Sequence, residues 1–194
     1  MKIKKLLFAS ALLFSAYNAS AQTQVIAHRG FWKTEGSAQN SIAALLKADS
    51  IGCYGSEFDV WLAADDQLVV NHDPTFKGKR MENSPSTALT AIKLDNGESL
   101  PTLAKYLKAA QPLHTRLILE LKAHSTPLRE TKAIEKIVAL VKDMGLEERM
   151  EYITFSLHAT KEFIRLAPEG TPVYYLDGNL SPKELKELGC AAPD

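Results

Sequence analysis

The stretch GSEFDVWLAADDQLVVNHD, residues 55–73, combines five carboxylates and a histidine with two runs that have the pattern of buried strands. Its first half has the apolar content of a buried strand, and an Asp-Asp-Gln turn leads into a second extended run that ends in His72. Successive side chains of a strand point to opposite faces, so Glu57 and Asp59 share one face while Phe58 takes the other. Two carboxylates on a core strand require a partner that compensates their charge.

On both sides of this stretch, extended segments alternate with helical ones. Strands are predicted at residues 25–30, 116–122, 152–157 and 172–178, and helices at 40–52, 101–110, 127–144, 158–167 and 181–189. A polar, irregular segment is predicted from about residue 74 to 99. Strands that alternate with helices indicate an α/β fold with a parallel sheet covered by helices, and we count about five or six parallel strands.

Charged residues fall near the carboxyl-terminal ends of four of the predicted strands. The pairs are His28 with Arg29, Glu57 with Asp59, His72 with Asp73, and Glu120 with Lys122. In a parallel (β/α) barrel these ends form the active-site face. Carboxylates there offer hard oxygen ligands to Ca²⁺ or Mg²⁺, the histidines offer an acid and a base, and the cations suit an anion such as phosphate.

Each of these pairs also has a purely structural interpretation. A single histidine is more often a structural residue, and Glu120 with Lys122 is equally well a plain ion pair. Glu57 and Asp59 on an apolar strand favour a functional role over a structural one. The four pairs together favour it more strongly than any single pair.

At these residues the sequence resembles the glycerophosphodiester phosphodiesterase family. The motifs H-R-G, E-x-D, H-D and E-x-K occur in that order, at residues 28–30, 57–59, 72–73 and 120–122. The resemblance covers about residues 24–180. It implies a TIM (β/α)8-type barrel, and the segment at about 74–99 resembles the small insertion that shapes the substrate pocket of these enzymes.

The resemblance also implies an activity and roles for individual residues. Family members hydrolyse glycerophosphodiesters, such as glycerophosphocholine, to glycerol 3-phosphate and an alcohol with a divalent cation. By this resemblance His28 and His72 are the general base and acid, Arg29 and Lys122 hold substrate phosphate oxygens, and Glu57, Asp59 and Glu120 bind the metal, Ca²⁺ or Mg²⁺. The expected partner is a small-molecule glycerophosphodiester.

Two features depart from the family pattern. Most relatives carry P-E-N-T after H-R-G, whereas this chain has AQNS at residues 38–41, so Gln39 replaces the acid. We expect this to alter metal affinity or specificity. Residues 22–194 are also few for a barrel of about 250 residues, so we expect the barrel to stop after about five or six strands and the chain alone to fold poorly or self-associate.

The first 21 residues predict a secretory signal peptide. MKIKK supplies the basic start, an apolar run follows, and Ala-Ser-Ala precedes Gln22. We therefore expect export to the periplasm or medium without stable membrane insertion, and a phosphodiesterase-like domain over residues 22–194. Cleavage removes three lysines and no acid, which takes the net charge from 0 to −3 and argues against nucleic acid. We expect Cys53 and Cys190 to remain free thiols.

Two rival functions remain open from the sequence. One is a related phospholipid phosphodiesterase of the phospholipase D-like kind, which would act on intact lipid. The other is a non-catalytic module that binds a phosphate headgroup. The sequence identifies neither the preferred alcohol nor the oligomeric state.

Overall fold

A computed structural model describes residues 23–191 of the chain. The predicted signal peptide, residues 1–21, lies outside these residues and stays a prediction. The helices, in chain order, are α1 (Ile42–Ser50), α2 (Ser86–Thr90), α3 (Leu103–Ala110), α4 (Pro127–Asp143), α5 (Leu157–Leu166) and α6 (Pro182–Leu188), with short 3₁₀ turns η1 (Met81–Asn83) and η2 (Glu147–Arg149).

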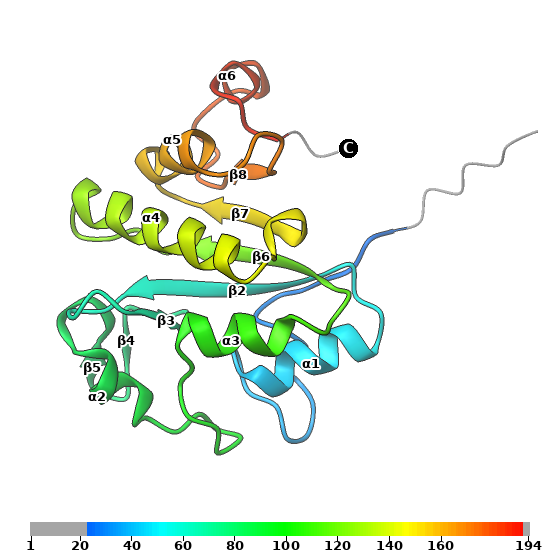
Figure 1. Cartoon of the computed structure of the whole chain (residues 1–194), viewed down its shortest axis with the longest axis vertical. Coiled ribbons are helices and arrows are strands. Elements are labelled where there is room, and N and C mark those ends of the chain that lie inside the picture. Colours follow the sequence, from blue (N-terminus) through cyan, green and yellow to red (C-terminus); the bar gives the residue numbers. More distant parts are fainter. Residues whose placement is uncertain (1–22, 192–194) are drawn as a thin grey trace, which may run out of the picture.

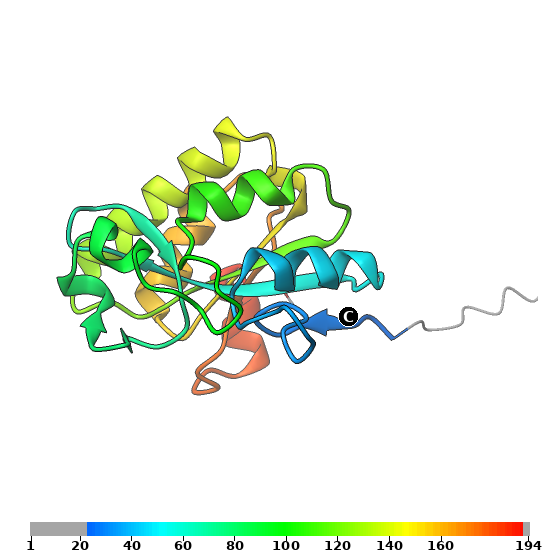
Figure 2. The same cartoon turned by 90° about the horizontal axis from the view of Figure 1, so that it is seen from below.

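A sheet with five parallel strands forms the centre of the molecule (Figure 1). Its order is β1 (Ile26–Ala27), β2 (Gly55–Leu62), β6 (Arg116–Leu121), β7 (Met150–Thr154) and β8 (Val173–Tyr175). Helices α1, α3 and α4 lie on one side of β2, and α6 lies on the other (Figure 2). The predicted alternation of helices with about five or six parallel strands is confirmed.

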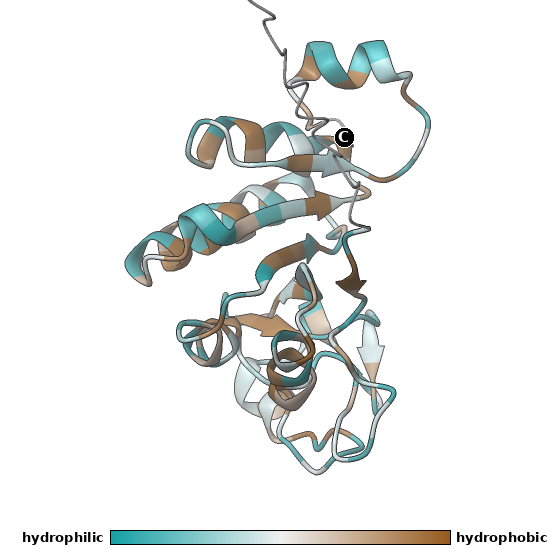
Figure 3. Ribbon diagram, turned by 90° about the vertical axis from the view of Figure 1, so that its right-hand side faces the viewer, coloured by the Kyte–Doolittle hydropathy of each residue, from teal (hydrophilic) through white to brown (hydrophobic). Residues whose placement is uncertain are grey.

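The strand alternation predicted for β6 is also found. Leu117, Leu119 and Leu121 are buried in the main hydrophobic core, together with Phe58 of β2. Along the helices, hydrophobic and hydrophilic positions alternate, as expected for elements that cover a sheet (Figure 3). The helix faces bury the outer side of the sheet, which leaves the opposite side to Glu57, Asp59 and Glu120.

Several predicted strands have different bounds in the structure. β1 ends at Ala27, because Arg29 and Gly30 have positive φ angles of 59° and 75° that a strand does not accommodate. β7 covers Met150–Thr154 rather than residues 152–157, since the Ser156 side chain accepts a hydrogen bond from the Ala159 amide and begins α5. β8 is limited to Val173–Tyr175.

The second half of the opening stretch forms an antiparallel strand. β3 (Leu68–Val70) pairs with the end of β2, with Val60 opposite Val70 and Leu62 opposite Leu68. This pairing extends β2 beyond the part that pairs with β6. Glu57 and Asp59 therefore lie within β2 rather than at its end. The same hairpin brings the chain back beside Asp59, where the main-chain N–H of Asn71 donates to the main-chain carbonyl of Asp59 at 3.0 Å.

The segment at about 74–99 is less irregular than predicted. It contains a hairpin of β4 (Thr75–Phe76) and β5 (Lys79–Arg80), followed by η1 and α2. A second hydrophobic cluster holds it to the sheet, and its buried members are Ala38, Trp61, Ala63, Val69, Met81, Leu89, Leu94 and Leu100. Both Glu98 carboxylate oxygens accept main-chain hydrogen bonds at the start of α1, from Ile42 and Ala43. The segment thus anchors the loop before α1.

Two smaller expectations concern thiols and membranes. Cys53 and Cys190 are both free thiols in the structure. Within residues 23–191, no helix combines the length and the apolar character needed to cross a bilayer.

Candidate active site

The H-R-G motif forms a tight turn directly after β1. A Cβ atom on Gly30 would lie 2.8 Å from the carbonyl carbon of Ala44, so only glycine allows α1 to pack this closely. The turn points the Arg29 main-chain amide at β2, where it donates to Glu57 Oε2 at 2.7 Å. The glycine and the left-handed Arg29 together bring the first loop onto the acidic strand.

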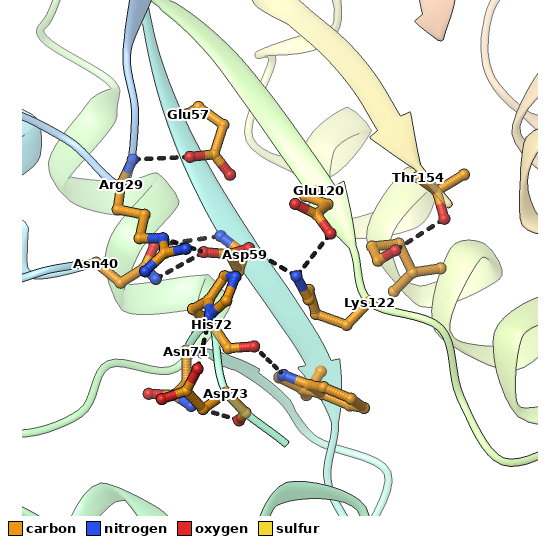
Figure 4. A network of polar contacts seen from close by, with 12 residues as sticks. Arg29, Asn40, Glu57, Asp59, Asn71, His72, Asp73, Glu120, Lys122 and Thr154 are labelled. Carbon is orange, nitrogen blue, oxygen red and sulfur yellow. Dashed lines mark hydrogen bonds and ion pairs between the residues drawn. The ribbon is translucent and has the colours of Figure 1, made fainter. Parts of the chain in front are cut away.

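Three carboxylates from two neighbouring strands meet beside this turn (Figure 4). Asp59 of β2 lies directly opposite Glu120 of β6 in the sheet register, and Glu57 lies two residues earlier on the same face. Their exposed fractions are 4% for Glu57, 0% for Asp59 and 6% for Glu120. One oxygen of each lies within 4.8 Å of the others, which is the arrangement of a candidate metal centre.

Two cationic side chains offset part of this negative charge. Lys122 Nζ lies 2.7 Å from Glu120 Oε1 and 3.3 Å from Asp59 Oδ1. Arg29 Nε lies 4.0 Å from Asp59 Oδ2. Glu57 Oε1 is buried and accepts no hydrogen bond from any residue in the range 23–191. Burial of a carboxylate oxygen without a donor is energetically costly, and a bound cation would offset that cost.

The pKa values of Glu57 and Glu120 reflect the same excess of buried negative charge. Burial, followed by the charge of Asp59, raises the pKa of Glu57 to about 8, and the hydrogen bond from the Arg29 amide opposes this rise. Burial also raises the pKa of Glu120, although Lys122 acts in the opposite direction. A divalent cation among these oxygens would stabilise their ionised forms. The donor set, all hard oxygens, therefore fits Ca²⁺ or Mg²⁺.

The two predicted histidines flank the carboxylates from different loops. His28 Nε2 lies 3.9 Å from Glu57 Oε2, and the side chain is 68% exposed. Partial burial, followed by the charge of Arg29, lowers the pKa of His28, while Asp59 raises it. His72 Nδ1 lies 2.7 Å from Asp73 Oδ1. A carboxylate that accepts from Nδ1–H orients the His72 ring and leaves its Nε2 for proton transfer.

Asn40 is a site residue that the sequence analysis did not assign. It is 2% exposed and has a positive φ of 59°. Its Nδ2 donates to Asp59 Oδ2 at 2.9 Å, and its Oδ1 accepts from the Asp59 amide at 3.2 Å. Asparagine adopts the left-handed conformation more readily than most residues, which was the available signal. Its neighbour Gln39 accepts from Arg29 Nη1 at 2.6 Å, so it contacts the predicted phosphate-binding arginine.

A hollow of about 280 Å³ opens beside the histidine side of the site. Its lining combines amide, aromatic and charged side chains: Trp32, Lys33, Ser37, Ala38, Gln39, Asn40, Asn71, His72, Asp73, Phe76, Leu94 and Asp95. Phe76, Leu94 and Asp95, from the segment at about 74–99, therefore contribute to the pocket. The hollow has the mixed lining and partial enclosure of a small-molecule site.

Comparison with known proteins places this site in context. No protein-family model matches the chain. A curated glycerophosphodiester phosphodiesterase of Caldanaerobacter subterraneus subsp. tengcongensis is 30% identical over 161 residues, which are 76% of this chain and 64% of the relative. The chain thus spans less than two thirds of that relative's length.

Solved structures give the same family. A glycerophosphodiester phosphodiesterase from Parabacteroides distasonis is 55% identical, with a TM-score of 0.84 over 86% of this chain and 70% of that one. An Oleispira antarctica phosphodiesterase, solved with the product sn-glycerol-3-phosphate, is 26% identical, with a TM-score of 0.73 over 87% of this chain and 73% of that one. These likenesses confirm the TIM-barrel type of fold, and the chain belongs to the glycerophosphodiester phosphodiesterase family.

Proposed function

We propose that the chain hydrolyses glycerophosphodiesters to glycerol 3-phosphate and an alcohol with the help of a divalent cation. The observation that carries this proposal is the set of three buried carboxylates within 4.8 Å of one another, flanked by two histidines and two cationic side chains. Membership of the family supports it, as does the product bound to the Oleispira relative.

Glu57, Asp59 and Glu120 would hold the cation, Ca²⁺ or Mg²⁺. Bound there, the ion would neutralise phosphodiester charge and make the phosphorus more electrophilic. Lys122 pairs with Asp59 and Glu120. A metal ion bound to these two carboxylates would weaken that pairing, and the Lys122 ammonium group could then bind a phosphate oxygen. Arg29 donates from Nη1 to the neutral amide of Gln39, which adds no negative charge of its own beside the guanidinium, so Arg29 would bind the same anion.

His28 and His72 would perform the proton transfers. One removes a proton from the nucleophile, and the other protonates the departing alkoxide. Asp73 orients the His72 ring through Nδ1, and the lowered pKa of His28 favours its neutral, proton-accepting form near pH 7. The two rings come from different loops, so each could serve a different proton transfer, one as the base and the other as the acid.

We further propose that the protein is exported, to the periplasm or the medium. This rests on the basic start, apolar run and Ala-Ser-Ala site of residues 1–21. Mass spectrometry of the mature N-terminus in the native host should give Gln22 as the first residue. Retention of Met1 in the cytoplasmic fraction would contradict export.

The test of the activity is glycerol 3-phosphate release from glycerophosphocholine by the purified chain. Release is measured with Ca²⁺, with Mg²⁺ and with EDTA, beside His28→Ala and the matched control His114→Ala, whose histidine lies on an exposed loop. Activity that is lost on chelation and in His28→Ala, and kept in His114→Ala, supports the proposal.

Two other outcomes correspond to the rival functions. Release from phospholipid vesicles but not from glycerophosphocholine would identify a phospholipid phosphodiesterase. A folded, cation-binding chain that hydrolyses neither substrate would be a headgroup-binding module. Either result would overturn the proposed activity.

A further inference from the structure

The hydrogen-bond ladder between β2 and β6 is interrupted at its carboxyl-terminal end. The Arg116 amide donates to the Tyr54 carbonyl at 2.9 Å, and the Lys122 amide donates to the Val60 carbonyl at 3.1 Å. Parallel strands repeat this pattern every two residues, so the next rung would run from the Leu62 amide to the Lys122 carbonyl. The structure has a side chain in that place.

The imidazole of His124 bridges the two main-chain groups. The Leu62 amide donates to His124 Nε2 at 2.9 Å, and His124 Nδ1 lies 2.6 Å from the Lys122 carbonyl. An amide N–H can only donate and a carbonyl can only accept, so the ring has a bare Nε2 and a protonated Nδ1. The ring therefore completes the rung in the neutral form. Burial lowers the pKa of His124, although the charge of Glu82 raises it, which agrees with a neutral ring.

The His124 ring is also linked, through Trp61, to His72, which is a second predicted site residue. It lies against Trp61, with ring centroids 5.3 Å apart. The Trp61 indole N–H donates to the main-chain carbonyl of His72 at 3.4 Å. The main-chain amide of His124 is itself fixed, since it donates to the buried Glu130 carboxylate at 3.1 Å. The His124 ring thus bonds to the main chain of Lys122 and packs against Trp61, which hydrogen-bonds to the main chain of His72.

We propose that His124 is a positioning residue of this active site. Its ring joins the ends of β2 and β6 and fixes the main chain from which Lys122 reaches Asp59 and Glu120. Both ring nitrogens are already used in main-chain hydrogen bonds, so His124 has no proton to exchange with substrate. It acts through Lys122 and, by way of Trp61, through His72. The catalytic consequence rests on the proposed function, whereas the state of the ring does not.

Two substitutions separate hydrogen bonding from packing in the full chain. His124→Gln keeps one donor and one acceptor in a side chain of similar length, and His124→Leu keeps bulk without either. His114→Gln is the matched control at an exposed histidine. The measurements are kcat and KM with glycerophosphocholine, Ca²⁺ affinity by calorimetry, the melting temperature, and nitrogen NMR of the histidine rings.

His124→Leu should lower kcat by about 10- to 100-fold, because small displacements of a positioned charge are costly to catalysis. KM should change less, His124→Gln should recover part of kcat, and His114→Gln should match the parent. The NMR spectrum of the parent should contain the signal of a neutral ring with its proton on Nδ1 that is absent in His124→Leu.

The proposal is overturned if His124→Leu folds and keeps the kcat and Ca²⁺ affinity of the parent. It is also overturned if the NMR signal assigned to His124 shows a proton on Nε2 at neutral pH. Should the parent chain hydrolyse nothing, the proposed function fails by itself. The ring state and the Ca²⁺ affinity of His124→Leu then decide the proposal about His124. This affinity should be lower than that of the parent, because β2 and β6 carry Asp59 and Glu120.

Discussion

Replacing Glu57 with Gln should stabilise the metal-free chain at neutral pH. The Glu57 side chain is buried, and burial and the charge of Asp59 raise its pKa from 4.5 to about 8. Between these values the folded chain retains a proton that the unfolded chain has released. Folding stability therefore falls by as much as about 1.4 kcal/mol per pH unit as the pH rises through this window.

The size of the effect follows from this window. Neutral pH lies about 2.5 units above the unfolded pKa, so the full penalty is about 3 kcal/mol. Asp59 and Glu120 share the repulsion, and we expect Glu57→Gln to recover about 1–3 kcal/mol. The new amide keeps an oxygen for the Arg29 N–H and places a donor beside the remaining carboxylates. Below the unfolded pKa, where the carboxyl is neutral in both states, the difference should vanish.

A divalent cation should reverse the order of the two proteins. Ca²⁺ stabilises the parent by binding its folded form, and Glu57→Gln lacks one anionic ligand, so we expect at least about 10-fold weaker binding. Thermal melts in EDTA and in Ca²⁺, at pH 4, 7 and 8.5, measure both effects. In EDTA at pH 7 the variant should melt about 3–10 °C above the parent.

Two results would refute this reasoning. One is a variant that is less stable than the parent in EDTA at pH 7, because the buried charge would then not be a cost. The other is an equal response of both proteins to Ca²⁺, because Glu57 would then not be a ligand.

Three further predictions concern the groups around the carboxylates. Gln39→Glu places an anion against Arg29 and should weaken the binding of glycerol 3-phosphate by about 3- to 10-fold, measured by calorimetry. An unchanged affinity would show that the Arg29 charge does not bind phosphate. Lys122→Met leaves Asp59 without its nearest cation and should destabilise the metal-free chain by about 1–3 kcal/mol in urea unfolding at pH 7. Ca²⁺ should reduce this loss of stability, and an equal loss with and without Ca²⁺ would contradict the prediction. His72→Ala should lower kcat by about 10²- to 10⁴-fold with Ca²⁺ affinity unchanged, and a parallel loss of Ca²⁺ binding would contradict its role as an acid or base.

Strand alternation made much of the site predictable from the sequence. The pattern of Glu57 and Asp59 opposite Phe58 required a buried polar face, and the structure places both beside Glu120. The helices were predictable because their caps are local: Thr126 accepts from the Arg129 amide at the start of α4, as its side chain and position suggest.

Long-range contacts account for what the sequence did not reveal. Asn40 and His124 act by bonding to main-chain groups of β2 and β6, so their roles appear only once the strands are in register. The identity of an asparagine or a histidine in a loop does not indicate which distant main-chain group its side chain will bond.

A calorimetric titration of Ca²⁺ and of Mg²⁺ into the metal-free chain and into Asp59→Asn tests the metal centre directly. If Glu57, Asp59 and Glu120 form a metal centre, the parent should bind one ion per chain and release protons, since the ion displaces the proton that the raised pKa of Glu57 retains. The variant should bind at least about 10-fold more weakly. No binding by a folded parent, or equal binding by both proteins, would contradict the claim.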